Sequence, residues 1–210
     1  MPRLKPLEDS ECTGTQRLLI ESARANGAPD PLCARIYART EAGRNWLRTW
    51  NELLNGGILP GPLKECVRVL ISTKHFCGYC STVRSNIAKS QGLTEDKILA
   101  TMDFENSDMF DDKEKAALRF ATKFKQGDEA IDSDAVYEDL KKQFSEEEII
   151  ELALLCAETD GVGKFARSLQ MRTWEEACDL QPLLRARSKT SAATERGSQP
   201  SALVAPAETA

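Results

Sequence analysis

Apolar residues recur at spacings of three and four along most of the chain, and the two-residue alternation typical of β-strands is scarce. The first such stretch follows Asp9 and Ser10, either of which can cap a helix, and it ends near Gly27. Pro29 and Pro31 then interrupt the pattern. The periodicity predicts an all-α fold.

A second helical stretch around residues 32–38 leads into a longer one over 44–54, which Gly56 and Gly57 terminate. The longer stretch carries an apolar stripe at helical spacing, made by Trp46, Leu47, Trp50, Leu53 and Leu54. We expect this stripe in the core or at a subunit interface rather than at a cofactor site.

The middle of the chain predicts three further helices. Prolines 60 and 62 open a strongly apolar one over 63–74, because proline is well tolerated in the first turn. The next is expected from Cys77 to about residue 90, ending at Gly92. Thr94 is then expected to cap a short helix that runs through residue 100.

The second half of the chain carries similar signals for the start and end of helices. Helices are predicted from Asp112 to Gly127 and from Ser133 to residue 144. Residues 145–148, Ser-Glu-Glu-Glu, form a capping box before the apolar run 149–156, whose hydrophobicity on all sides predicts a buried central helix. Gly161 and Gly163 are expected to mark a kink or a close helix contact.

Composition divides the chain into three parts and argues against several classes of protein. We expect a helical arm at 1–30, a helical domain at 31–184 and, in a Ser-, Thr-, Ala- and Pro-rich segment, a disordered tail at 185–210. The net charge of −5 argues against nucleic acid. No apolar run suggests a signal peptide or a membrane span, so seven cysteines in 210 residues favour a reducing, cytoplasmic location.

Cys77 and Cys80 are separated by two residues, so they form a Cys-x-x-Cys pair at the expected start of a helix. A thiol there faces unpaired N–H groups and the positive end of the helix dipole, which lower its pKa. A second thiol one turn away can close a disulfide. The pair therefore predicts redox chemistry, with two inert buried cysteines or a zinc site as the alternatives.

Neither a metal nor a cofactor is expected. Zinc requires a second pair of ligands, and Cys66 and His75 have no usual zinc spacing relative to the pair. The acidic stretch 102–112 lacks the order of a calcium-binding EF-hand loop. Residues 161–164 resemble a phosphate loop only superficially, since Phe165 stands where Ser or Thr would bind magnesium.

Glu65 lies twelve residues before Cys77, with Leu59-Pro60 just upstream and a Gly-Leu-Thr step at 92–94 after the pair. This pattern resembles the alkylhydroperoxidase D-like branch of the carboxymuconolactone decarboxylase family. The resemblance covers roughly residues 32–174, and its specificity comes almost entirely from 59–92. It implies a multi-helix domain assembled as a trimer or a hexamer.

In the scheme that the resemblance implies, Cys80 attacks a peroxide and Cys77 resolves the sulfenic acid as a disulfide. Glu65 and a histidine four residues after the second cysteine relay the proton. That position is Arg84 here, and an arginine can lower the pKa of Cys80 by its charge but cannot shuttle a proton. His75, the only histidine, could replace the missing proton carrier or simply lie at a helix end.

The sequence leaves two questions open: which cysteine attacks the substrate, and which reaction the protein catalyses. A thioredoxin-like site would use Cys77 rather than Cys80 as the attacking thiol. The function that we expect is thiol-dependent reduction of a peroxide or exchange of disulfides, supported by a thiol reductant protein. The alternatives are a non-redox lyase or isomerase acting on a small organic acid, whose relatives generally lack the paired cysteines, and a non-catalytic helical oligomer.

Overall fold

The computed structural model describes residues 2–28 and 31–180, and every regular element within them is helical, as the sequence predicted. The expected tail at 185–210 lies outside the described residues. Within the described ranges, no helix has both the length and the apolar character needed to cross a bilayer.

The first half of the described chain contains seven α-helices and one 3₁₀ turn: η1 (Asp9–Glu11), α1 (Gly14–Ala25), α2 (Leu32–Tyr37), α3 (Glu41–Asn55), α4 (Gly61–Lys74), α5 (Gly78–Thr82), α6 (Asn86–Ser90) and α7 (Glu95–Ala100). The second half contains η2 (Thr101–Asn106), α8 (Asp112–Gln126), α9 (Asp128–Ile131), α10 (Asp134–Lys141), α11 (Glu146–Ser168) and α12 (Trp174–Leu180).

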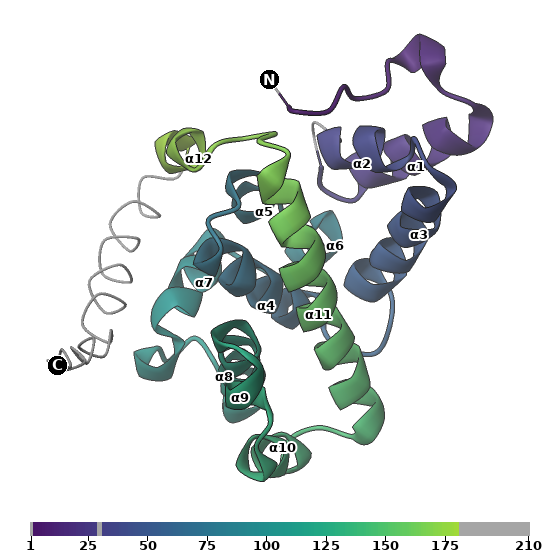
Figure 1. The fold of residues 1–210 in the computed structure, drawn as a ribbon. Helices are drawn as coiled ribbons and strands as arrows, with labels where there is room; N and C mark the ends of the chain where they lie inside the picture. Colours follow the sequence, from purple (N-terminus) through teal and green to yellow (C-terminus); the bar gives the residue numbers. More distant parts are fainter. Residues whose placement is uncertain (1, 29–30, 181–210) are drawn as a thin grey trace, which may run out of the picture.

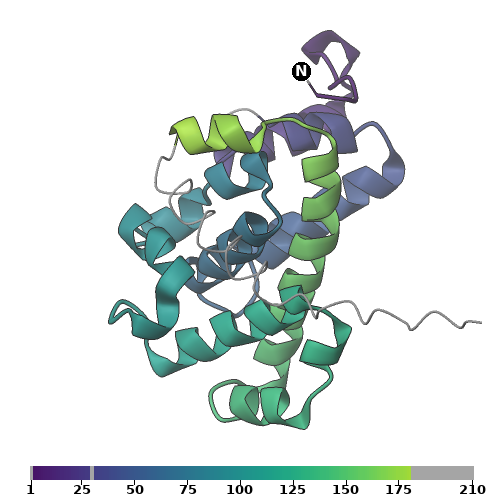
Figure 2. The ribbon, with the colours of Figure 1, turned by 60° about the vertical axis from the view of Figure 1, so that its left-hand side comes forward.

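Helix α4 lies at the centre of the molecule, between α8 and the long helix α11 (Figures 1 and 2). All residues from 63 to 73 of α4 are buried, including the charged Lys64, Glu65 and Arg68. The main core forms where apolar side chains of α4, α8 and α11 meet, and Leu70, Phe120 and Leu152 are among its members. The central position of α4 means that its polar side chains must find partners inside the protein.

Residues 2–28, which belong to the expected arm at 1–30, pack on the rest of the described chain through a second apolar cluster. Ile20 of α1 joins Tyr37 of α2, Leu47 of α3 and Leu169, just after α11. Figure 1 shows α1, α2 and α3 together on one side of α11. This cluster forms one flank of the cavity described below.

Several predicted helix boundaries differ in the structure. Helix α1 is capped by Thr13 rather than by Asp9 or Ser10, because Thr13 and Gln16 form a reciprocal capping box. Helix α10 ends at Lys141 instead of residue 144. The predicted caps at Thr94 and Ser145 are confirmed, since each side chain accepts a backbone N–H of the first turn.

The expectation that α11 is buried on all sides is wrong. Ile150 and Leu154 are 60% and 52% exposed, and Phe165 is 46% exposed. The reason is that α4 and α8 cover only one side of α11, while α3 and α5 contact other parts of it. A strip of apolar side chains on α11 is therefore left open in the single chain.

Candidate active site

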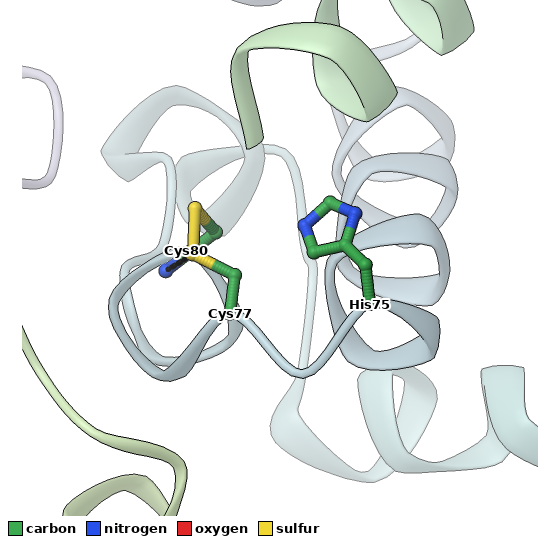
Figure 3. Close-up of side chains that lie close together, drawn as sticks. All are labelled: His75, Cys77 and Cys80. Atoms are coloured by element: carbon green, nitrogen blue, oxygen red, sulfur yellow. Dashed lines mark hydrogen bonds between the residues drawn. A yellow bond between two sulfur atoms is a disulfide. The ribbon is translucent and has the colours of Figure 1, made fainter. Parts of the chain in front are cut away.

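The dithiol lies at the corner between α4 and α5. Helix α4 ends at Lys74, Phe76 adopts a left-handed backbone conformation with φ of 55°, and Cys77 then forms the N-cap of α5. Cys77 and Cys80 are joined as a disulfide, with their Cα atoms 5.3 Å apart (Figure 3). The Cys80 N–H donates a hydrogen bond to Cys77 Sγ at 3.2 Å. The turn at Phe76 thus places Cys77 at the start of α5, and the three-residue spacing brings its sulfur to that of Cys80.

A cavity of about 390 Å³ lies against this corner, and the two cysteines have different relations to it. Cys80 is half-buried and lines the cavity. Cys77 is 0% exposed and is not among the lining residues. Only one sulfur of the pair therefore belongs to a residue that an incoming molecule can reach.

Part of the cavity lining is aromatic. Trp46 and Trp50 of α3 stack with ring centroids 5.5 Å apart, and Tyr37 of α2 meets Trp46 edge-on at 5.1 Å. The Trp46 indole N–H donates to Glu158 of α11 at 2.5 Å. Part of the stripe expected in the core or at a subunit interface is thus a cavity wall, a role that its spacing alone did not reveal.

Beneath the dithiol lies a buried ion pair between Glu65 and Arg68, one turn apart on α4. The Arg68 guanidinium donates two hydrogen bonds to the Glu65 carboxylate, each at 2.8 Å. Burial favours a higher pKa for Glu65, but the Arg68 charge, its hydrogen bonds and the Ser85 N–H hold the pKa below its ordinary value. Glu65 is therefore a buried, paired carboxylate rather than an exposed one.

The same ion pair terminates α5. Arg68 donates to the carbonyl oxygens of Cys80, at 2.5 Å, and Val83, at 2.7 Å, while Glu65 accepts the Ser85 N–H at 2.9 Å. These bonds satisfy backbone groups that a continuous helix would pair internally. The single helix predicted from Cys77 to residue 90 is therefore wrong: it is split at 83–85 into α5 and α6.

This break changes the position of Arg84. The sequence placed Arg84 one turn after Cys80 on a common helix, but Arg84 lies in the extended linker after α5. Its guanidinium donates to the carbonyl oxygens of Ser81, at 2.6 Å, and Val83, at 2.8 Å, and forms an ion pair with Glu95 at 3.1 Å. Arg84 still lines the cavity, as Cys80 does, but its charge is shared with Glu95.

His75 lies beside the two cysteines, is 5% exposed and is not among the residues that line the cavity. Neither ring nitrogen has a hydrogen-bond partner. Its Nδ1 lies 3.8 Å from the Asp160 carboxylate of α11, and burial together with Lys125 lowers the pKa of His75 to about 4. A neutral imidazole with such a low pKa is a weak base, which argues against a role as proton carrier.

Gly163 explains how α11 approaches His75. A Cβ at this position would lie 2.5 Å from His75 Cε1, so the absence of a side chain makes room for the ring. The sequence predicted a kink or a close helix contact here, and the close contact is confirmed. Asp160 was missed, because its proximity to His75 depends on the packing of α11 against the end of α4.

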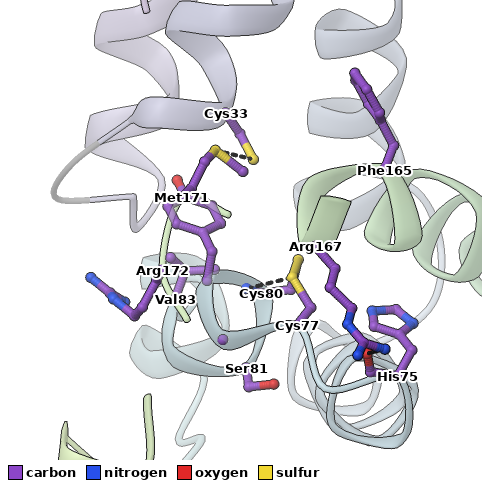
Figure 4. The surroundings of a disulfide bond; sticks show 12 residues. Cys33, His75, Cys77, Cys80, Ser81, Val83, Phe165, Arg167, Met171 and Arg172 are labelled. Atoms are coloured by element: carbon purple, nitrogen blue, oxygen red, sulfur yellow. Dashed lines mark hydrogen bonds between the residues drawn. A yellow bond between two sulfur atoms is a disulfide. The ribbon is translucent and has the colours of Figure 1, made fainter. Parts of the chain in front are cut away.

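The wider surroundings are shown in Figure 4. Arg167 of α11 donates to the His75 carbonyl oxygen at 2.8 Å, and Cys33 of α2 lies 3.6 Å from the Met171 sulfur. Burial raises the pKa of both Cys33 and Cys66 to about 12, which keeps these thiols protonated. The buried thiols of Cys33 and Cys66 are thus poor nucleophiles compared with the Cys77–Cys80 pair.

These observations define an all-helical domain with a cysteine pair at the edge of a cavity. Residues 40–123 match the model of the carboxymuconolactone decarboxylase family, which confirms the expected family for this segment of the chain. The segment runs from the N-cap of α3 into α8 and contains Glu65, Cys77, Cys80 and Arg84.

Individual relatives are distant. The uncharacterized protein YdfG of Bacillus subtilis is 23% identical over 92 residues, which span 44% of this chain and 63% of YdfG. The debrominase Bmp8 has a similar structure, with a TM-score of 0.62, 19% identity and coverage of 88% of this chain and 95% of Bmp8. A cysteine-to-alanine variant of Bmp8 in complex with 2,3,4-tribromopyrrole gives a TM-score of 0.63 at 18% identity, covering 90% and 99% of the two chains. At these identities the similarity to Bmp8 establishes the shared fold alone.

Proposed function

We propose that the protein is a thiol oxidoreductase whose Cys77 and Cys80 cycle between a dithiol and a disulfide. The observation that carries this proposal is the asymmetry of the pair: Cys80 lines the cavity, and Cys77 is sealed behind it. This asymmetry supports Cys80 as the attacking thiol and Cys77 as the resolving one. The alternative order, by analogy with thioredoxin, would need a reagent to reach the buried sulfur.

With a peroxide, the proposed cycle has three steps. The Cys80 thiolate attacks one oxygen of ROOH, the O–O bond breaks, and a proton completes ROH while Cys80 becomes a sulfenic acid. The Cys77 thiol then displaces hydroxide, which leaves as water, and the disulfide forms. A reductant dithiol, which we expect from a partner protein, returns two electrons and two protons to the pair.

The polar residues nearby then have supporting roles. We assign Glu65 to positioning, since its carboxylate is occupied by Arg68 and by the Ser85 N–H. Arg84 lends positive charge to the cavity but exchanges no proton, so protonation of the leaving oxygen falls to solvent. We therefore expect peroxide turnover to be slow relative to disulfide exchange, whose leaving group is a thiolate.

The test distinguishes the attacking cysteine from the resolving one. On brief exposure to hydrogen peroxide, we expect Cys77→Ser to accumulate a Cys80 sulfenic acid that dimedone captures, as detected by mass spectrometry. Cys80→Ser should give no adduct at residue 77, because that sulfur is buried. Cys12→Ser, a change outside the cavity lining, is the matched control and should behave as the wild type. Equal labelling of both cysteines would contradict the proposed order.

The aromatic wall favours a second candidate, reductive dehalogenation of a small halogenated aromatic ring. The stacked indoles and Cys80 line the same cavity, where a flat ring would find both an aromatic surface and a thiol, and the similar fold of the debrominase Bmp8 supports the comparison. The reaction balances on the same dithiol: an aryl bromide and two thiols give the arene, a disulfide and hydrogen bromide. The cysteine pair supplies both electrons.

Bromide release distinguishes the candidates. The reduced protein is mixed with 2,3,4-tribromopyrrole or with cumene hydroperoxide, and bromide, alcohol and disulfide are quantified. One bromide for each disulfide formed, with slow reaction of the hydroperoxide, would select dehalogenation. The reverse result would select peroxide reduction, and no reaction with either would leave disulfide exchange as the remaining redox activity.

Non-redox reactions have less support. A lyase or isomerase acting on an organic acid would not need the Cys77–Cys80 pair, and two of the arginines that line the cavity are already paired, Arg68 with Glu65 and Arg84 with Glu95. A non-catalytic oligomer would not need a cavity at its cysteine pair. Assembly as a trimer or a hexamer remains our proposal for the quaternary structure, and the cytoplasm remains our proposal for its location.

A further inference from the structure

We infer that the reduced site binds a metal ion: once the Cys77–Cys80 disulfide is opened, the two sulfurs and the His75 imidazole form a three-ligand site for a thiophilic cation of the Zn²⁺ type. This inference departs from the expectation drawn from the sequence, which found no second ligand pair. It rests on the dithiol state that the proposed function also uses.

The first argument is geometric. Among the described residues, His75, Cys77 and Cys80 are the one group of potential donors close enough to share an ion, with their ligand atoms within 4.8 Å of one another. Figure 3 shows the His75 imidazole beside the two sulfurs, with one ring nitrogen toward them. Zinc accepts both thiolate sulfur and imidazole nitrogen, so the chemical nature of the donors fits.

The second argument comes from the unsatisfied ring. Buried polar nitrogens are normally hydrogen-bonded, yet both nitrogens of His75 lack a partner although the residue is 5% exposed. A metal ion on one nitrogen would satisfy it. The other would then need an acceptor, and Asp160 Oδ1, which also pairs with Lys125 at 3.0 Å, lies 3.8 Å from Nδ1.

Asp160 therefore suits the role of the carboxylate that orients a metal-bound histidine through its second nitrogen. Its charge is shared with Lys125 and Lys164, whose ammonium groups lie 3.0 Å and 2.5 Å away. Two thiolates would neutralise the charge of Zn²⁺, and burial of a neutral cluster costs less than burial of an ion. The fourth ligand position is left for water or a molecule from the cavity that Cys80 lines.

The binding step involves no electron transfer. Zn²⁺ replaces the two thiol protons, which are released to solvent, and the imidazole donates a lone pair. Because both sulfurs are then occupied, neither is free to attack a substrate. Metal binding and disulfide formation are consequently competing fates of the same reduced pair.

The experiment measures zinc binding to the full chain in both redox states. The untagged protein is reduced with a phosphine, separated from it anaerobically, and titrated with Zn²⁺ against a chromophoric chelator. We expect one Zn²⁺ per reduced chain and no comparable binding to the disulfide form. His75→Gln should weaken binding by at least about tenfold, whereas Cys12→Ser should leave it unchanged.

A second measurement does not depend on how the variants fold. His75 is the only histidine, so protein labelled with ¹⁵N-histidine gives one set of ring nitrogen signals. One nitrogen should shift when Zn²⁺ is added to the reduced protein, and neither should shift in the oxidised protein. An unshifted ring in zinc-loaded reduced protein, or zinc binding no tighter than that of Cys80→Ser, would overturn the inference.

These outcomes are independent of the proposed function. No peroxide, halogenated ring or protein reductant enters the titration, so absence of turnover would leave the metal result intact. Conversely, a reduced protein that reacts with peroxide but binds no zinc would retain the oxidoreductase proposal and remove the metal site.

Discussion

At the scale of single residues, three charged side chains of α4 are buried in different ways. Lys64 donates to the carbonyl oxygens of Leu53 and Gly56 and pairs with Glu151 of α11, while Glu65 and Arg68 pair with each other. The sequence identified Glu65 by its spacing from Cys77, but it gave no sign that the carboxylate is buried. Burial depends on α5, α6 and α11, which close over α4 from distant parts of the chain.

Removing the charge of Glu65 should destabilise the folded protein. In Glu65→Gln, the buried Arg68 guanidinium loses its counter-charge, and the Ser85 N–H faces an amide instead of a carboxylate. Loss of one member of a buried ion pair typically lowers the free energy of unfolding by about 3–5 kcal/mol. Urea denaturation should show this loss of unfolding free energy. The control Glu105→Gln, in an exposed pair with Arg119, should cost no more than about 1 kcal/mol. Equal effects of the two variants would contradict the structural role of Glu65.

His75 should make stability depend on pH. Its pKa in the folded chain is lowered from 6.5 to about 4, so between these values the unfolded chain binds a proton that the folded chain does not. Unfolding free energy should therefore be at its full value above about pH 6.5 and fall as the pH approaches 4, by roughly 1–3 kcal/mol from this group. In His75→Gln, that portion of the decline should be absent from denaturation curves collected across this range.

At the scale of elements, local signals in the sequence predicted most helices and several caps, because capping boxes and terminating glycines act within a few residues. They failed at the boundary between α5 and α6. Residues 77–90 have no proline, but Glu65 and Arg68, from a preceding helix, bind the backbone at 80, 83 and 85. Interactions across such a distance leave no mark in local periodicity.

The pair of glycines on α11 offers a matched test of helix packing. Gly163→Ala would place a methyl group 2.5 Å from His75 Cε1, so the ring must move, at a cost of about 1–3 kcal/mol. Gly161→Ala meets no atom within 4 Å and should instead stabilise the helix by up to about 1 kcal/mol. Thermal unfolding of both variants should give shifts of opposite sign, and two shifts of the same sign would refute this view of the contact.

At the scale of the whole molecule, the cavity is assembled from elements that lie far apart in sequence. Its lining includes residues of α1, α2, α3, α4, α5 and α11, such as Ala23, Trp50, Cys80 and Ala166. The sequence placed the thiols and the tryptophans in separate helices, but their arrangement around one space follows only from tertiary packing. The candidate chemistry could thus be predicted, whereas the shape of the site could not.

The exposed apolar strip of α11 provides a surface through which copies of the chain could form an oligomer. Ile150 and Leu154 are four residues apart, so they share one face of the helix, and covering that face in an oligomer would remove it from water. Light scattering should show an oligomer for the wild type. Leu154→Glu should dissociate it by placing a charge in the interface, while Leu18→Glu, at a similarly exposed leucine of α1, should not. A wild-type monomer would argue against the assembly that the family implies.

The sealed position of Cys77 has a further consequence for steady-state kinetics. Since Cys80 is the only cysteine of the redox pair that lines the cavity, the oxidising substrate and the reductant must meet the same sulfur through the same opening. They cannot occupy the enzyme together, so a double-displacement scheme follows, with parallel lines in double-reciprocal plots. An excess of either reactant should then inhibit the half-reaction of the other.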